Sequence, residues 1–567
     1  VFNMQGNILV TDKTMPPYQQ QQPSVINIGL GRAHNSPNQF TGKAVNTLED
    51  KGGEINMTFD GGMWSHDNMG GLEAFQIKGN EARSSINTLK GTRTREGFSR
   101  ISQDSRSDIH VNNLDGHINV IYDMSAGTGL NFTKPAAQKT GLDAADIEGG
   151  NFIVKSATTG SGVHGYVTGD HLDTSSESNV NKILDNLAHK FYYENYMNGE
   201  RNLSGTVSIA SNGIVSSFQK ALTTDQKEGA ITWQNGNGQG SYAAPTPVTP
   251  VTPVTPAPTP VTPSPVVTPG AYDTPQMRGI RSAVVGNINA WRTMTSDMNR
   301  ANQLQQGSPT GIWARIGGGR YNYANDGINT ATDYTSIQGG YDTKTSRDWT
   351  VGGQVSYLRG SEDYVFNGSG KVKSYAVGAY GLKDLGKDQY VHVESQVGRI
   401  SNEFTARNEI GQAKSGDVKS NAYSIGVRYG KTIKYANGFY VEPQAQLNYT
   451  HFGGRDFTAG NVSVNQAGVN STSGKLGLEV GKQFGNGNLY TRFAAGHAFT
   501  GNVKTTYASG NAVKLTEQDL KGTWTELAFG GRYGFNTNNS VYADVTTGLS
   551  GDYQADWGVN AGFTHKF

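Results

Sequence analysis

The chain has 567 residues, of which 75 are Gly, 27 are Tyr and none is Cys, and its formal net charge is +1. The near-neutral charge gives no electrostatic basis for nucleic-acid binding, and the lack of Cys excludes disulfides, thiolate metal sites and a cysteine nucleophile. No segment approaches the ~18 consecutive apolar residues of a membrane-spanning helix. Composition does not exclude a transmembrane β-barrel, because only every second residue of its strands must be apolar. The chain begins at Val1 without a secretory leader pattern, so we expect a processed or truncated product.

The region before residue 243 is expected to form short stacked strands. Residues 1–53 are polar and Gln/Asn-rich without a period, which predicts a disordered segment or part of a truncated repeat. In 54–242, short alternating runs recur between Gly, Asn and Asp, as in a β-solenoid. A helix is expected at 179–197, because apolar residues from Val180 to Phe191 recur at helical spacing. It would pack against the end of the solenoid or bind a partner.

A linker is predicted at 243–273. Ten of the eighteen prolines lie between Pro245 and Pro269, in a Pro/Thr/Val-rich run. Such a run adopts polyproline II at roughly 3.1 Å per residue and forms a semi-rigid spacer of about 75 Å. The alternative is a ligand for a proline-recognition module, although no basic residue flanks a PxxP motif here.

A helix is predicted at 274–309. Pro275 suits a first turn, and the Gly307-Ser308-Pro309 sequence suits a stop. Its apolar residues are scattered among Asn, Arg, Ser and Thr, so it lacks the wide apolar stripe of a core helix. We therefore expect it in a polar, water-lined environment.

Residues 310–567 contain twelve alternating segments. They begin near Ile312, Thr332, Trp349, Val372, Gln389, Lys419, Phe439, Thr472, Leu489, Thr523, Ser540 and Ala555. The connections after even-numbered segments are short, whereas most of the others are longer and polar, including about 402–417, 453–471 and 501–521. Short turns on one rim and long loops on the other are typical of an outer-membrane barrel, with the short turns in the periplasm. A soluble sandwich gives no reason for this sorting.

The last strand is apolar on one face, which carries Trp557, Val559, Ala561, Phe563 and Phe567. An apolar strand that ends in an aromatic residue is hard to justify in a soluble protein. Here the sequence resembles the translocator of type V secretion autotransporters, whose terminal strand ends in Phe and is the signal for the barrel assembly machinery. The resemblance covers roughly residues 275–567 and says nothing about the region before the linker.

Candidate chemistry is sparse. Residues 1–240 contain no Gly-x-Ser-x-Gly elbow, no Gly-Asp-Ser-Leu or Gly-Asp-Ser-Gly block and no HExxH or P-loop motif. Two clusters have metal-ligand residue types and are interpreted as solvated turns: His164, Asp170, His171 and Asp173, and Asp60, His66 and Asp67. We predict no enzymatic activity, no cofactor and no metal.

Four charged residues are predicted to point into the barrel lumen: Arg428, Glu442, Glu526 and Arg532. We interpret them as a ladder of mutually satisfied charges that contacts the helix. Some members of the resembled family cut their passenger free at an Asn-Asn peptide in the helix. This helix has Asn287-Ile288-Asn289 and Asn299-Arg300-Ala301-Asn302 but no Asn-Asn, which argues against that cleavage.

The combined expectation is an all-β chain with a β-solenoid-like passenger, a Pro-rich linker, a lumenal helix and a 12-stranded antiparallel barrel. The resemblance implies an outer-membrane autotransporter that displays its passenger, an adhesin or surface-structure protein, on the cell surface. Expected partners are outer-membrane lipid and lipopolysaccharide, the barrel assembly machinery, periplasmic chaperones and a ligand on a host or neighbouring cell; the barrel is expected to be monomeric. The two alternative functions are an enzyme whose catalytic part lies upstream and a porin-like channel with a periplasmic domain.

Overall fold

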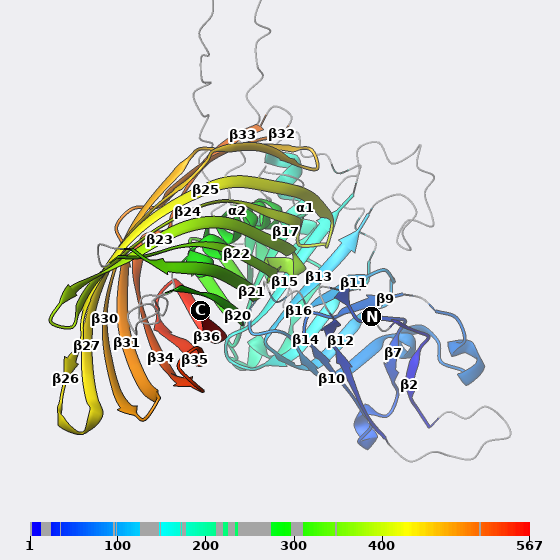
Figure 1. Cartoon of the computed structure of the whole chain (residues 1–567). Coiled ribbons are helices and arrows are strands. Elements are labelled where there is room, and N and C mark those ends of the chain that lie inside the picture. The colour runs from blue at the N-terminus through cyan, green and yellow to red at the C-terminus, as the bar shows by residue number, and fades with distance from the viewer. Residues whose placement is uncertain are drawn as a thin grey trace, which may run out of the picture. The chain divides into compact units, whose positions relative to one another are not determined.

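A computed structural model describes residues 3–12, 24–33, 36–67, 69–94, 97, 99–124, 147, 149–169, 172, 177–210, 219–224, 233–235, 274–295, 310–345, 349–509 and 512–567. These residues form two compact units (Figure 1). One is made of Val1–Pro275, Val365–Asn367 and Arg407–Gln412, and the other of Gln276–Tyr364, Gly368–Ala406 and Ala413–Phe567. The predicted linker lies outside the described residues. Among the described residues, no helix has the length and apolar character to cross a membrane.

The amino-terminal unit contains two main sheets. The first has, in spatial order, β1 (Asn3–Gln5), β6 (Gln39–Thr41), β9 (Met63–His66), β11 (Arg100–Gln103), β13 (His117–Asp123), β15 (Ser161–Thr168), β17 (Leu203–Ile209), β18 (Gln219–Thr224) and β19 (Trp233–Asn235). The second has β3 (Val25–Leu30), β8 (Glu54–Phe59), β10 (Ser84–Lys90), β12 (Ile109–Asp115), β14 (Phe152–Ala157) and β16 (Phe191–Tyr193). The unit also has two small two-stranded sheets. One pairs β2 (Ile8–Val10) with β7 (Ala44–Asn46), and the other pairs β4 (Arg32–Ala33) with β5 (Ser36–Pro37).

Consecutive strands from β8 to β17 enter these two sheets in turn, and neighbours within each sheet are parallel up to β17. Equivalent side chains therefore stack from strand to strand, as Ile101 does on Val120. The buried core between the sheets consists of such stacks. The expectation of disorder before Glu54 is wrong for the described residues, because Val25–Leu30 already pairs with β8.

Helix α1 (Glu177–Ala188) buries Val180, Ile183 and Leu187 in this core. The helix is shorter than the predicted 179–197. It ends at Ala188 because Phe191 enters strand β16, where it pairs with Phe152 and is buried. The apolar residue that extended the helical period is thus a strand residue.

The second unit is a closed antiparallel barrel of twelve long strands, as predicted (Figure 1). They are β20 (Thr310–Asn325), β21 (Ile328–Lys344), β22 (Trp349–Asp363), β23 (Ser369–Gly386), β24 (Gln389–Arg407), β25 (Ala413–Lys431), β27 (Phe439–Phe452), β30 (Val469–Phe484), β31 (Gly487–Ala498), β34 (Gly522–Gly534), β35 (Asn539–Ser550) and β36 (Tyr553–Lys566). The barrel closes where β36 pairs with β20, with Lys566 opposite Gly311. Both ends of the barrel chain therefore share one rim.

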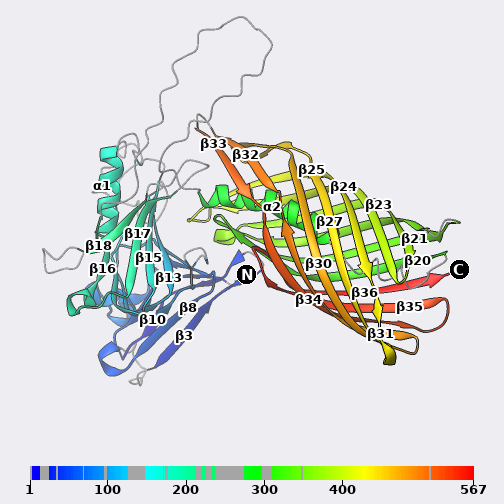
Figure 2. The same ribbon diagram turned by 90° about the vertical axis from the view of Figure 1, so that its left-hand side faces the viewer.

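The other rim carries strand extensions instead of the long irregular loops that the sequence suggested. Hairpins β28 (Arg455–Ala459) with β29 (Val462–Gln466) and β32 (Asn502–Ser509) with β33 (Ala512–Asp519) occupy most of 453–471 and 501–521. The connection expected at 402–417 is only residues 408–412, because β24 extends to Arg407 and β25 begins at Ala413. Figure 2 shows β32 and β33 at the end of the barrel opposite the carboxy terminus. On the terminal rim, the short β26 (Ile433–Lys434) precedes β27.

The outer surface of the barrel is apolar. Along β22 to β24, for example, Val355, Val377 and Val397 point outward and are each more than half exposed, at 60%, 57% and 54%. Their sequence neighbours point inward and are buried or half-buried. Exposed apolar side chains around a closed barrel are the signature of a lipid-facing surface.

Candidate functional site: the helix-filled lumen

Helix α2 (Pro275–Thr295) lies inside the barrel (Figure 2). At about 1.5 Å per residue, its 21 residues span roughly 32 Å, comparable to the height of a membrane-spanning barrel wall. Its side chains are buried almost throughout, and Met277, Ile280 and Ala283 have no exposed surface. The helix thus occupies the space that would otherwise be a channel. Residues 296–309 of the predicted helix lie outside the described residues.

The amino-terminal half of α2 is held at the rim that carries the hairpins. Arg281 Nη2 lies 2.7 Å from Asp326 Oδ2, in the turn between β20 and β21, and also donates to Gln518 of β33. On another face of the helix, Asn402 Nδ2 of β24 donates to the Ala283 carbonyl at 3.2 Å. These contacts fix which end of the helix faces which rim.

Two helix glycines allow the wall to approach closely. A Cβ at Gly286 would lie 2.2 Å from Glu362 Oε1, and one at Gly279 would lie 2.6 Å from the Ala406 Cβ. Gly279 and Gly286 are seven residues apart and therefore lie on the same helix face. That face is packed against β22 and β24.

The carboxy-terminal half of α2 makes both apolar and polar contacts. Val284, Ile288 and Trp291 pack against Leu358, Val372, Ile400 and other buried wall residues. The expectation of a polar, water-lined environment is therefore wrong for this face of the helix, because the inner wall is apolar where it meets Val284, Ile288 and Trp291.

Hydrogen bonds surround that apolar contact. Trp291 Nε1 donates to Ser424 Oγ at 2.6 Å, and Thr293 Oγ1 lies 2.6 Å from the Tyr553 hydroxyl. Gln338 Nε2 donates to the Met294 carbonyl at 3.1 Å. Since these partners come from β25, β36 and β21, the helix is tied to wall strands on several sides.

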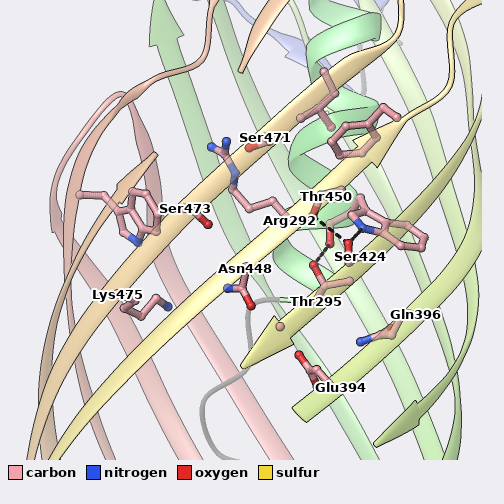
Figure 3. Close-up of a pocket in the computed structure, with 15 residues that line it drawn as sticks. Arg292, Thr295, Glu394, Gln396, Ser424, Asn448, Thr450, Ser471, Ser473 and Lys475 are labelled. Carbon is pink, nitrogen blue, oxygen red and sulfur yellow. Dashed lines mark hydrogen bonds between the residues drawn. The ribbon is translucent and has the colours of Figure 1, made fainter. Parts of the chain in front are cut away.

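A cavity of about 40 Å³ lies beside the end of the helix (Figure 3). Its polar lining includes Arg292, Glu394, Gln396, Asn448 and Lys475. One water needs about 10–15 Å³ of space open to the centre of a water-sized sphere, so a cavity of this size holds a few waters at most. Its size is far below that of a solute channel.

The four predicted lumenal charges are all on the inner wall and at most half-exposed. Glu442 accepts hydrogen bonds from Tyr390 at 2.9 Å and Thr432 at 2.7 Å, and Arg428 Nη2 donates to Gln446 at 3.1 Å. Glu526 is paired with Lys475 at 2.6 Å, and Arg532 donates to Ser540 at 3.0 Å. These partners all belong to the wall itself, whereas the contacts that anchor α2 come from other residues.

Those anchoring residues, chiefly Arg281, Glu362 and Asn402, were missed by the sequence interpretation. Glu362 and Asn402 occupy inward positions of their strands, so strand parity could have flagged them. The buried pair of Glu479 and Arg492, 3.5 Å apart on adjacent strands, was missed in the same way. Nothing in the sequence indicated which of these inward polar residues would meet the helix.

The predicted assembly-signal residues lie on the outer face of β36 or just beyond it. Trp557, Val559, Phe563 and Phe567 are 49%, 44%, 41% and 67% exposed, and Ala561 shares their face. The Phe567 N–H donates to the Thr310 carbonyl at 2.9 Å, which extends the closing seam of the barrel.

In the amino-terminal unit, His164 lies between His117, with nitrogen atoms 3.0 Å apart, and the Thr206 hydroxyl at 2.9 Å. Asp170, His171 and Asp173 lie outside the described residues. Within the described residues, no group of three or more His, Asp or Glu side chains is arranged to hold a metal.

An apolar outer surface, a closed antiparallel wall and a helix through the lumen define an outer-membrane β-barrel with an internal plug. Residues 312–546 match the family described as autotransporter β-domain. Relatives include the pertactin autotransporter of Bordetella parapertussis, 27% identical over 39% of this chain and 24% of its own, and serine protease EspP of Escherichia coli, 26% identical over 45% and 20%. The β-domain of the Bordetella autotransporter BrkA, a solved structure, has 20% identity and a TM-score of 0.38, covering 46% of this chain and 99% of its own. The carboxy-terminal barrel is an autotransporter β-domain, a type V secretion translocator of the outer membrane of Gram-negative bacteria.

Proposed function

We propose that the barrel exports residues 1–242, here called the passenger, and displays them on the cell surface. The orientation of α2 carries this proposal. Arg281, near the start of the helix, meets Asp326 at the hairpin rim, whereas β20 begins at the terminal rim. With the terminal rim in the periplasm, the chain that precedes α2 leaves the barrel on the outside.

The passenger is proposed to be a β-solenoid that acts in adhesion or surface structure. Parallel strands that enter two sheets in turn support this, because each added turn extends a regular contact surface. Folding outside the cell would also favour export, since a folded solenoid cannot slide back through a lumen of this size. The chain spans about a quarter or less of the length of the curated relatives named above, so the passenger of the whole protein is longer if it resembles theirs.

We further propose that residues 1–242 have no catalytic role. The Ser161 hydroxyl donates to the Leu114 carbonyl and accepts from the Gly116 N–H, which ties it to backbone. His164 is held in the ladder with His117 and Thr206. The name of EspP describes a serine protease. Hydrolysis of a peptide or ester substrate by purified residues 1–242 would overturn the proposal.

The proposed binding partners follow from the position of the barrel in the outer membrane. The outward residues of β36, from Trp557 to Phe567, are proposed as the signal for the barrel assembly machinery after periplasmic chaperones deliver the chain. The outer wall contacts lipid and lipopolysaccharide, the barrel acts as a monomer, and the passenger binds a ligand on a host or neighbouring cell.

Trypsin treatment of intact cells tests export. The chain is expressed behind a signal peptide and detected with separate antibodies against 54–240 and 311–567. We expect the passenger signal to disappear while a barrel fragment remains. A passenger that is cleaved only after the outer membrane is permeabilised would place it in the periplasm and refute the proposal.

A further inference from the structure

Basic side chains gather on the outer face of the barrel at the hairpin-rim ends of β22, β23 and β24. Arg359 of β22 lies directly opposite Lys373 of β23. Arg399 of β24 lies opposite Tyr375, the next outward residue of β23 after Lys373. Arg359 and Arg399 are exposed and Lys373 is half-buried. We call these three residues the basic cluster.

The charges of the basic cluster are poorly compensated within the protein. Like charges directly opposite each other destabilise a sheet, yet Arg359 and Lys373 are so placed. Glu403 approaches Lys373 only at 4.0 Å, and Arg359 Nε donates to the neutral Thr335 hydroxyl at 3.1 Å. Among the described residues, neither Arg359 nor Arg399 forms an ion pair with a carboxylate. The arrangement calls for an external anion.

The basic cluster lies at the outer boundary of the apolar band. On β23, the outward residues from Lys373 to Lys383 span ten residues, about 34 Å along a strand and roughly 26 Å across a membrane at a tilt of about 40°. The apolar band of such barrels is ~25 Å tall. The rings of Tyr357 and Tyr375, 4.8 Å apart, mark the aromatic girdle just below the cluster.

An open hollow of about 770 Å³ lies in the outer wall beside the cluster. Its lining includes Ile337, Val355, Val377, Val397, Tyr375 and Arg399. Gln338 and Ser356 also line it. The four aliphatic residues named here point outward and are 52–60% exposed. An apolar hollow that ends at a guanidinium group fits a molecule with an acyl chain and an anionic head group.

We propose that this part of the wall binds lipid A, the phosphorylated and acylated glucosamine glycolipid that anchors lipopolysaccharide in the outer leaflet. Arg359, Lys373 and Arg399 bind a phosphate, and an acyl chain lies in the hollow. Arginine suits the phosphate because its guanidinium group donates two parallel hydrogen bonds to neighbouring oxygens. The site rests on the proposed function in one respect, since it requires the hairpin rim to face outward.

Binding of lipid A to the purified full-length chain in detergent tests the site. The probe is hexa-acylated diphosphoryl lipid A, measured by native mass spectrometry or a fluorescent analogue. We expect the triple variant Arg359→Gln/Lys373→Gln/Arg399→Gln to bind at least tenfold more weakly. The matched control is Lys383→Gln, on the same outward face at the opposite boundary, which should bind like the wild type.

Three results would overturn the proposal: equal binding by the triple variant and the wild type, equal binding of dephosphorylated lipid A, or equal competition by phosphatidylglycerol. Heat-modifiable migration on gels shows that each variant is folded. Trypsin treatment of cells that express the triple variant separates this site from export. Loss of lipid A binding with intact display supports the site, whereas a passenger never displayed by the wild type refutes the proposed function instead.

Discussion

Gly286 of helix α2 faces the carboxylate of Glu362 in strand β22 so closely that a Cβ on the helix would lie 2.2 Å from Oε1. Glu362 accepts hydrogen bonds from Asn402, whose amide also donates to the helix at Ala283, and from Tyr364. One buried acidic residue thus links two wall strands and the helix. The absence of a side chain at position 286 is what allows this contact.

Replacing Gly286 with Val is expected to destabilise the seated helix. The added methyl groups must displace Glu362 or move the helix, and overpacking of this kind costs about 1–3 kcal/mol. We expect a lower Tm for the purified barrel in detergent, measured by circular dichroism. Gly353→Ala is the control, because a Cβ there points outward and lies 3.8 Å from its nearest neighbour. An unchanged Tm for both variants would mean that the helix contact contributes nothing to barrel stability.

Trp291→Ala should lower the free energy of unfolding by more than the loss of any single polar contact of the helix. The side chain is fully buried and packs beside the inner wall, so its removal is expected to cost about 3–5 kcal/mol. Ser424→Ala removes the hydroxyl that accepts from Nε1 and that also lies 2.7 Å from the Thr450 hydroxyl, and it should lower the free energy of unfolding by about 1–3 kcal/mol. Urea unfolding of both variants compares the two contributions. Equal losses would show that the hydrogen bond, and not the packing, holds the helix.

Strand periodicity predicted the barrel well because its alternation is local. In β27, Tyr440, Glu442 and Gln444 are buried and alternate with the outward residues between them. The position of the polar helix followed from topology, since both ends of the barrel share a rim. Its anchors did not follow, because Arg281 and Asp326 are 45 residues apart and no local pattern joins them. The apolar inner wall was missed for a similar reason: Leu358 and Ile400 become neighbours of α2 only when the barrel closes.

Acid is expected to weaken the passenger through His66. Burial first, and then the charge of Lys43, lower the pKa of His66 to about 3, although its hydrogen bond to Gln103 acts the other way. The unfolded chain binds a proton near pH 6.5 and the folded chain does not, so stability is complete above pH 6.5 and falls toward pH 3. The loss is about 1.4 kcal/mol per pH unit in that window.

Protease resistance of the displayed passenger measures this effect. Trypsin susceptibility on intact cells, compared at the same pH between the wild type and His66→Gln, should converge as the pH falls from 7 to 5. The variant lacks the titrating group and should show the weaker pH dependence. Identical pH dependence in the two proteins would mean that His66 does not control acid stability.

Phe567→Ala is expected to impair assembly in cells while leaving the assembled barrel nearly as stable. The Phe567 side chain is 67% exposed, its ring meets that of His565 edge-on, and its backbone N–H joins the seam, so truncation removes little packing. The proposed signal for the assembly machinery, in contrast, would lose its exposed ring. Outer-membrane yield should fall several-fold, and the Tm of the purified fraction should stay within about 2 °C. Leu549→Ala, another outward residue at 53% exposure, controls for general loss of outer apolar surface.

Deleting residues 275–306 should open the lumen. Helix α2 fills the barrel, and the cavity beside its end measures about 40 Å³, so the intact chain is expected to show low conductance in planar bilayers. The deletion removes the buried side chains from Met277 to Met294 and with them the contact to the inner apolar wall. Conductance should rise at least severalfold and become steady. A porin-like channel would conduct equally well before and after the deletion, because its ions would follow a path that the helix does not block.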